Sequence, residues 1–287
     1  MKILLLSTFV GLLCIVSPAQ SVPLTSQAPV PQIVEVRGGS LKLKAYFWKP
    51  TGRGPFPVVV FNHGSGGEDA QHTAGHTMAE AAAVLAPVFL KHGYAFFYLC
   101  RRGQGLSADQ GSFMQDLLHQ EEAARGKDAR AQLHYKLATT DHLDDALAGL
   151  AVAKDMPGID LKGVVMAGHS FGGVLALLSG EKDPVIRAEV TFGAANSWKT
   201  APELRERILS AVRKTSAPIM LIQATNDYDT TPGTAIAAEL EQLHAPHLLK
   251  IYPALGRSSD DGHNLVYLAI AEWEPDVFQF LDSRVKR

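Results

Sequence analysis

The chain has 287 residues, of which 46% are hydrophobic and 20% are charged, and its formal net charge is −2 at pH 7. This length suits one large α/β domain, and the near-neutral charge argues against a basic face for nucleic acid.

The N-terminus has the pattern of a secretory signal peptide over residues 1–21. Lys2 precedes an apolar run from Ile3 to Val16, and small residues near Ala19 and Ser21 offer cleavage sites. The run is too short to span a bilayer, and no later segment is long and apolar enough to do so. We therefore expect a secreted or periplasmic protein with no stable membrane span.

The cysteine content predicts a protein without an internal disulfide. Cleavage of the signal removes Cys14 and leaves Cys100 alone at the end of an apolar run. We expect Cys100 to be a buried, unreactive thiol.

After an extended, proline-containing leader at 22–32, residues 33–287 read as one domain in which strands and helices alternate. The alternation predicts an α/β fold with a mostly parallel, eight-stranded sheet and helices on both faces. The first two strands lack an intervening helix and should form an antiparallel edge hairpin. Strands are predicted near 33–37, 41–49, 57–62, 94–100, 163–168, 187–194, 218–224 and 247–252. Helices are predicted near 75–92, 138–156, 172–180, 201–214, 233–244 and 264–282.

Residues 101–137 break this rhythm after the fourth strand. They carry many charges, several glycines and only scattered apolar positions. Segments of this length without regular structure are usually lids or disordered loops, so we expect an insertion or small cap here.

The pentapeptide Gly168-His169-Ser170-Phe171-Gly172 follows an apolar strand and precedes an apolar helix. Such a G-x-S-x-G turn exposes its serine on a sharp strand-to-helix bend, and the flanking glycines let strand and helix approach closely. Ser170 is the candidate nucleophile.

A serine nucleophile needs a base and a group that orients the base. In a parallel sheet these groups lie on loops after the carboxyl ends of strands. Asp227 follows the strand at 218–224, and His263 follows the last strand by about ten residues. They are the candidate acid and base, with Asp229 as a rival acid. Asp260 and Asp261 are weaker alternatives, because they lie too close in sequence to His263 to orient it easily.

The loop after the third strand reads His63-Gly64-Ser65-Gly66-Gly67. A backbone N–H of such a loop can face a developing oxyanion. We expect the Ser65 and Phe171 amides to form a two-donor oxyanion hole.

These motifs resemble the α/β-hydrolase superfamily, and within it the dienelactone hydrolase and related serine esterase group, over about residues 33–283. The resemblance implies Ser170 as nucleophile, Asp227 as acid and His263 as base, with the oxyanion hole at Ser65 and Phe171. Dienelactone hydrolases proper use a cysteine nucleophile, so the serine favours a general esterase or peptidase. The motifs are His63–Gly67, Arg102-Gly103-Gln104-Gly105-Leu106-Ser107, Gly168–Gly173, Asn226-Asp227 and Gly262-His263.

Several nearby polar residues favour structural roles. His63 should brace the oxyanion turn, and His169 should point into the sheet. Arg101 and Arg102 should stabilise the turn after the fourth strand, with contact to an anionic substrate group as the alternative. Trp198 could line a pocket or pack in the core. The cluster of His63, His72 and His76 lacks further ligands at a metal-site spacing, so neither metal nor cofactor is expected.

The sequence therefore predicts a serine hydrolase that cleaves a small-molecule carboxylic ester or lactone through an acyl-serine intermediate. An aminopeptidase-like serine peptidase acting on peptide or amide bonds is the alternative within enzymes. A non-catalytic binding protein on a hydrolase scaffold is the alternative from another class. Fold analogy alone does not choose the substrate.

Overall fold

The computed structural model describes residues 30–66 and 69–285. The predicted signal peptide lies outside the described residues, as does the predicted leader up to residue 29. Val30 and Pro31 lead directly into the first strand.

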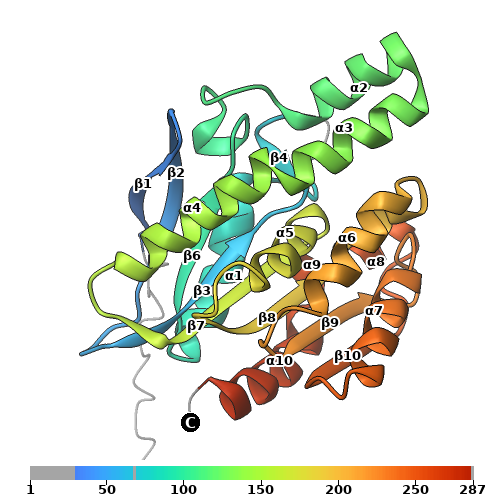
Figure 1. Cartoon of the computed structure of the whole chain (residues 1–287). Coiled ribbons are helices and arrows are strands. Elements are labelled where there is room, and N and C mark those ends of the chain that lie inside the picture. Colours follow the sequence, from blue (N-terminus) through green and yellow to red (C-terminus); the bar gives the residue numbers. More distant parts are fainter. Residues whose placement is uncertain (1–29, 67–68, 286–287) are drawn as a thin grey trace, which may run out of the picture.

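An eight-stranded sheet forms the centre of the molecule (Figure 1). Its order is β1-β2-β6-β3-β7-β8-β9-β10, in which β1, β2 and β6 pair antiparallel and every other pairing is parallel. The predicted mostly parallel sheet and its antiparallel edge hairpin are confirmed. The strands are β1 (Gln32–Gly38), β2 (Leu41–Trp48), β3 (Phe56–Asn62), β6 (Ala95–Cys100), β7 (Ile159–His169), β8 (Ile186–Phe192), β9 (Ile219–Ala224) and β10 (His247–Tyr252).

The central strands are apolar on both sides because helices cover both faces of the sheet. Val58 and Val60 of β3 face one core, while Val59 and Phe61 face the other. The first core is covered by α4 (Asp141–Asp155), α5 (Phe171–Gly180), α6 (Pro202–Val212) and α7 (Thr231–Gln242). The second is covered by α1 (Met78–Lys91), α9 (Leu265–Leu268) and α10 (Ile270–Arg284).

Short elements complete the carboxyl edge of the sheet. A small hairpin of β4 (His72–Thr73) and β5 (His76–Thr77) follows β3, the 3-10 helix η2 (Asn196–Lys199) follows β8, and α8 (Ser259–His263) follows β10. Each begins within ten residues of the end of a strand, so the edge collects polar side chains from distant parts of the chain.

The insertion is more regular than its sequence predicts. It contains the 3-10 helix η1 (Gly105–Ser107) and two antiparallel helices, α2 (Met114–Arg125) and α3 (Lys127–Thr139). Only Met114 and Leu118 of α2 are buried, so the helix lacks the wide apolar stripe that reveals a helix in sequence. The expectation of a segment without regular structure is therefore wrong, and the expectation of an insertion after the fourth strand of the sheet holds.

Within residues 30–66 and 69–285, none of the helices has both the length and the apolar character needed to cross a bilayer. Cys100 is a free, buried thiol at the end of β6, as the sequence predicts, and burial raises its pKa to about 12.

Candidate active site

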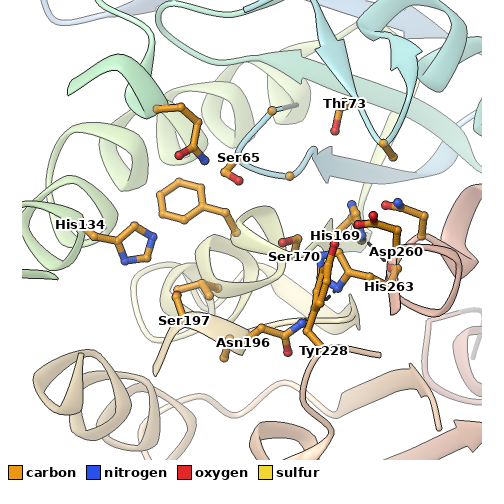
Figure 2. A pocket seen from close by; sticks show the side chains of 18 of the residues that line it. Ser65, Thr73, His134, His169, Ser170, Asn196, Ser197, Tyr228, Asp260 and His263 are labelled. Atoms are coloured by element: carbon orange, nitrogen blue, oxygen red, sulfur yellow. Dashed lines mark hydrogen bonds between the residues drawn. The ribbon is translucent and has the colours of Figure 1, made fainter. Parts of the chain in front are cut away.

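Ser170 lies on a strained turn between β7 and α5. Its φ of 55° and ψ of −119° are unfavourable for a residue with a side chain, and strain of this kind persists where the surroundings fix it. The Ser170 N–H donates to the Phe192 carbonyl at 2.8 Å. A Cβ on Gly172 would stand 2.0 Å from the Asn62 carbonyl, so only glycine fits there. The turn presents the Ser170 side chain to the main pocket (Figure 2).

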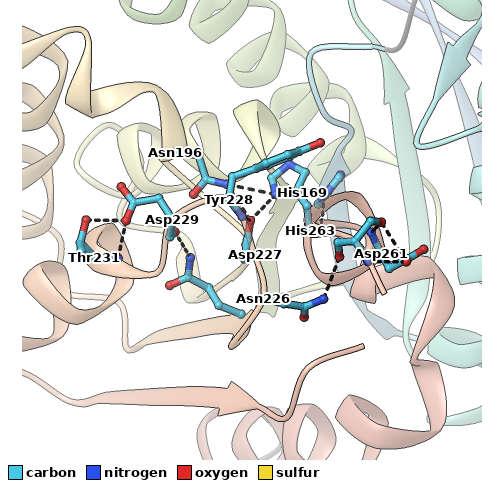
Figure 3. A network of polar contacts seen from close by, with 11 residues as sticks. His169, Asn196, Asn226, Asp227, Tyr228, Asp229, Thr231, Asp261 and His263 are labelled. Carbon is cyan, nitrogen blue, oxygen red and sulfur yellow. Dashed lines mark hydrogen bonds and ion pairs between the residues drawn. The ribbon is translucent and has the colours of Figure 1, made fainter. Parts of the chain in front are cut away.

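Asp227 and His263 form a buried pair (Figure 3). His263 Nδ1 lies 2.8 Å from Asp227 Oδ1, with the histidine on α8 and the aspartate on the loop after β9. This contact assigns the proton to Nδ1 and leaves Nε2 able to accept a proton. A capping box between Ser258 and Asp261 starts α8 and fixes the segment that carries His263.

Ser170 and His263 line one pocket without a direct hydrogen bond between them in the described chain. Hydrogen bonds between catalytic groups are often long before substrate binds and shorten in the complex. The arrangement thus brings the predicted nucleophile, base and acid to one place.

Asp229, the rival acid, has other partners. Its Oδ1 accepts from the Thr231 backbone at 2.9 Å and from the Thr231 hydroxyl at 2.7 Å, and its Oδ2 lies 3.1 Å from Lys199 Nζ. Burial opposes ionisation of Asp229, but these partners outweigh it and lower its pKa. Asp229 therefore supports the start of α7, and Asp227 is the acid in contact with His263.

Asn196 is a member of the site that the sequence did not predict. From η2, its Nδ2 donates to Asp227 Oδ1 at 2.8 Å and lies 3.1 Å from His263 Nδ1. The available signal was its position just past the end of β8. Trp198 from the same segment is 5% exposed and packs in the core. Of its two expected roles, the structure shows core packing.

The two amides of the predicted oxyanion hole lie on adjacent elements. Phe171 is the first residue of α5, so its N–H has no intrahelical acceptor and stands at the positive end of the helix dipole. Ser65 lies on the loop after β3 and lines the same pocket. Its N–H has no acceptor among the described residues.

His169 supports the base and does not point into the sheet as expected. It is buried, and its Nε2 donates to the His263 carbonyl at 2.9 Å. Burial and the neighbouring His263 ring lower its pKa well below the usual range. His169 is thus a neutral support for the backbone that carries His263.

The turn after β6 has the structural contacts predicted for its arginines. Arg102 donates through Nε and Nη2 to the two oxygens of buried Asp145, at 2.9 and 2.8 Å. Arg101 is fully buried and faces the loop that carries His63 and Ser65. Neither arginine lines the pocket.

The pocket has a volume of about 880 Å³ and two different walls. One wall comes from the insertion, through Gln115 and Leu118 of α2 and Arg130, Ala131 and His134 of α3. The other comes from loops and short helices at the sheet edge and includes Tyr228, Asp260, Asn264 and Leu268. Among the described residues, no group of three or more His, Cys, Asp or Glu side chains could hold a metal ion.

Comparisons with known proteins identify relatives by sequence. The model described as the dienelactone hydrolase family matches residues 43–263. The quorum-quenching protein AidA of Acinetobacter baumannii (strain MDR-ZJ06) is 24% identical over 270 residues, which are 90% of this chain and 74% of AidA.

Two solved structures show the same architecture at low sequence identity. A putative dienelactone hydrolase from Klebsiella pneumoniae subsp. pneumoniae MGH 78578 has a TM-score of 0.61 at 17% identity, covering 90% of this chain and 98% of that one. The uncomplexed acylaminoacyl peptidase of Pyrococcus horikoshii has a TM-score of 0.61 at 16% identity, covering 87% of this chain. The chain spans only 41% of that peptidase, so this likeness concerns the fold alone.

Proposed function

The chain belongs to the dienelactone hydrolase family and has its α/β-hydrolase fold, and we propose that it is a serine hydrolase that cleaves a carboxylic ester or lactone. One observation carries the proposal. His263, which contacts buried Asp227 at 2.8 Å, lines the same pocket as the strained Ser170.

In the proposed first half-reaction, His263 Nε2 takes the proton of the Ser170 hydroxyl as its oxygen attacks the substrate carbonyl carbon. Asp227 holds the imidazole in the required tautomer and stabilises the imidazolium that forms. The Ser65 and Phe171 amides donate to the tetrahedral oxyanion. His263 then protonates the leaving oxygen, the carbon–oxygen bond breaks, and an acyl-serine remains.

In the second half-reaction, His263 takes a proton from water, and the resulting oxygen nucleophile attacks the acyl carbon. The tetrahedral species collapses with return of the proton to Ser170, and a carboxylic acid leaves. Ser170, Asp227, His263 and the two amides supply every group that these steps require, and no cofactor takes part in them.

The proton transfer constrains how the substrate lies. The leaving oxygen must approach His263 Nε2, so the leaving group occupies the wall formed by Tyr228 and Asn264. The acyl group then extends toward α2 and α3, where Leu118 and Ala131 supply apolar surface.

A peptidase that recognises a free amino terminus would be the second candidate. Such an enzyme needs a carboxylate for the substrate ammonium, and the insertion contributes Gln115, Arg130 and His134 to the pocket but no carboxylate. Elsewhere in the lining, Asp69, Asp260 and Asp261 carry carboxylates, and these favour the peptidase alternative. Rates with aminoacyl p-nitroanilides and with p-nitrophenyl esters of matched size separate the two.

The AidA relative suggests a biological setting. Quorum quenching removes a diffusible signal, and hydrolysis of an ester or lactone bond would inactivate a signal that contains one. A secreted or periplasmic location, as the sequence of residues 1–21 suggests, would place this chain where it could meet such small molecules.

The direct test compares the mature protein with Ser170→Ala on p-nitrophenyl acetate and butyrate and on a lactone. We expect the variant to lose at least about 10⁴-fold in kcat while its circular dichroism and melting temperature stay near wild type. Wild-type activity retained in Ser170→Ala would show that another residue is the nucleophile.

A further inference from the structure

The guanidinium of Arg101 binds the backbone of the oxyanion loop. Arg101 is fully buried, and within the described residues it forms no ion pair. Its Nη1 donates to the His63 carbonyl at 2.8 Å, and its Nη2 donates to the Gly64 carbonyl at 2.8 Å. A buried cation that donates hydrogen bonds to two consecutive carbonyls fixes the orientation of both peptides.

The second of these peptides contains a proposed catalytic donor. The Gly64 carbonyl and the Ser65 N–H belong to one peptide unit, in which a trans bond makes them point in opposite directions. With the carbonyl held toward Arg101, the Ser65 N–H must face away from it, on the side where Ser65 lines the pocket.

Two further contacts extend this arrangement. Gln104, from the same turn, donates through Nε2 to the Ser65 carbonyl at 3.1 Å and so holds the next peptide. The guanidinium carbon of Arg101 lies 5.4 Å from the centre of the Phe171 ring, within the range of a cation–π contact. Arg101 therefore contacts the elements that carry both proposed donors.

The neighbouring groups leave Arg101 charged and the histidines neutral at neutral pH. Burial lowers the pKa of Arg101 to about 10, opposed chiefly by Asp145. Burial and Arg101 together hold the pKa values of His63 and His142 well below the usual range. His63 Nδ1 donates to the Gly64 carbonyl at 2.7 Å, which adds a neutral donor to the same acceptor.

We infer that Arg101 is a positioning residue for the oxyanion hole, holding the Gly64–Ser65 peptide and the Phe171 side chain so that both amides face the reacting carbonyl. This inference rests on the proposed function, because an oxyanion forms only if Ser170 attacks a carbonyl. It assigns the fully buried arginine to transition-state stabilisation and not to contact with an anionic substrate group.

The test uses Arg101→Lys, Arg101→Met and the control Arg102→Lys in the mature protein. Lysine keeps the charge but cannot form the fork to two carbonyls, and methionine removes both charge and fork. Arg102 occupies the same turn and bonds Asp145 without contacting residues 63–65, so its substitution reports on disturbance of the turn.

Three quantities are measured on p-nitrophenyl butyrate: kcat per titrated active site, KM, and inhibition by a trifluoromethyl ketone that forms an oxyanion on binding. We expect kcat to fall about 100-fold in Arg101→Met and about 10-fold in Arg101→Lys, with KM within threefold of wild type. Affinity for the ketone should fall in parallel with kcat/KM, and Arg102→Lys should match wild type in all three.

A kcat within threefold of wild type in Arg101→Lys and Arg101→Met would overturn the inference, as would a rise in KM that accounts for the whole loss. Equal losses in Arg102→Lys would also overturn it, because they would indicate general disturbance of the turn. If Arg101→Met does not fold, Arg101→Lys and Gln104→Leu decide by the same criteria. A wild-type protein that hydrolyses no ester and whose Ser170 resists a fluorophosphonate would refute the proposed function itself, and the inference would fall with it.

Discussion

The two walls of the pocket are built in different ways. At the sheet edge, Ser170, Asp227 and His263 stand on short segments after β7, β9 and β10, and backbone or side-chain hydrogen bonds hold each of them. The opposite wall is the α2–α3 hairpin, whose pocket residues Leu118 and Ala131 make apolar contacts. From this difference we expect the proposed reaction to depend on the sheet edge and the choice of acyl group to depend on the insertion.

We expect the largest effect on activity when the acid at the sheet edge is removed, and this substitution tests the proposed role of the sheet edge. Asp227→Asn replaces the acceptor of the His263 Nδ1 proton and favours the wrong tautomer, so we expect kcat for a p-nitrophenyl ester to fall about 10⁴-fold. Steady-state kinetics at neutral pH measure the loss.

Asp229→Asn is the matched control for that substitution. Its carboxylate bonds Thr231 and Lys199 and does not contact His263, so kcat should stay within about tenfold of wild type. The assignment of the acid would be wrong if the two variants exchanged their effects.

A second test asks whether the insertion responds to acid through a buried histidine. His134 is 9% exposed beside the Phe171 ring, and burial with nearby Arg130 lowers its pKa to about 4. Its neutral form therefore stabilises the fold fully above pH 6.5, and this contribution is lost as pH falls through 4.

The free energy of unfolding falls between pH 7 and pH 4 in both proteins. We expect this fall to be about 3 kcal/mol smaller in His134→Gln than in wild type. Urea unfolding of both proteins across this range gives the difference, and histidines common to both chains cancel. Parallel pH profiles would contradict the buried, neutral state of His134.

The smallest expected effect tests whether the insertion determines which acyl groups the pocket accepts. Ala131→Leu adds volume to the pocket wall on α3, so kcat/KM for p-nitrophenyl octanoate should fall about tenfold while that for the acetate stays near wild type. Exposed Ala124 on α2 does not line the pocket, and Ala124→Leu serves as the control. An equal loss on both esters would place the acyl group elsewhere.

The sequence predicted which segments meet at the sheet edge, because the signals of these segments are local. Ser170 lies in a glycine-flanked turn between an apolar strand and an apolar helix, and each feature reads directly from neighbouring residues. The order of Asp227 and His263 after later strands follows from parallel topology. The choice between Asp227 and Asp229 needed coordinates, since both follow the same strand two residues apart.

The insertion and Asn196 were harder to predict for a common reason. Met114 and Leu118 are the buried residues of α2, so its pattern lacks the apolar repeat of a packed helix. Asn196 acts through contacts with Asp227 and His263 from separate loops, and no short motif encodes such a meeting. The expectation that His169 points into the sheet was wrong for the same reason: its hydrogen-bond partner is a carbonyl 94 positions away in the sequence.

The most direct measurement of the central claim is fluorophosphonate labelling of the mature protein, with the modified residue located by peptide mass mapping. The account predicts stoichiometric modification of Ser170 alone, at a rate strongly reduced in Asp227→Asn and near wild type in Asp229→Asn. Modification of another residue, or equal rates in wild type and Asp227→Asn, would contradict activation of Ser170 by the Asp227–His263 pair.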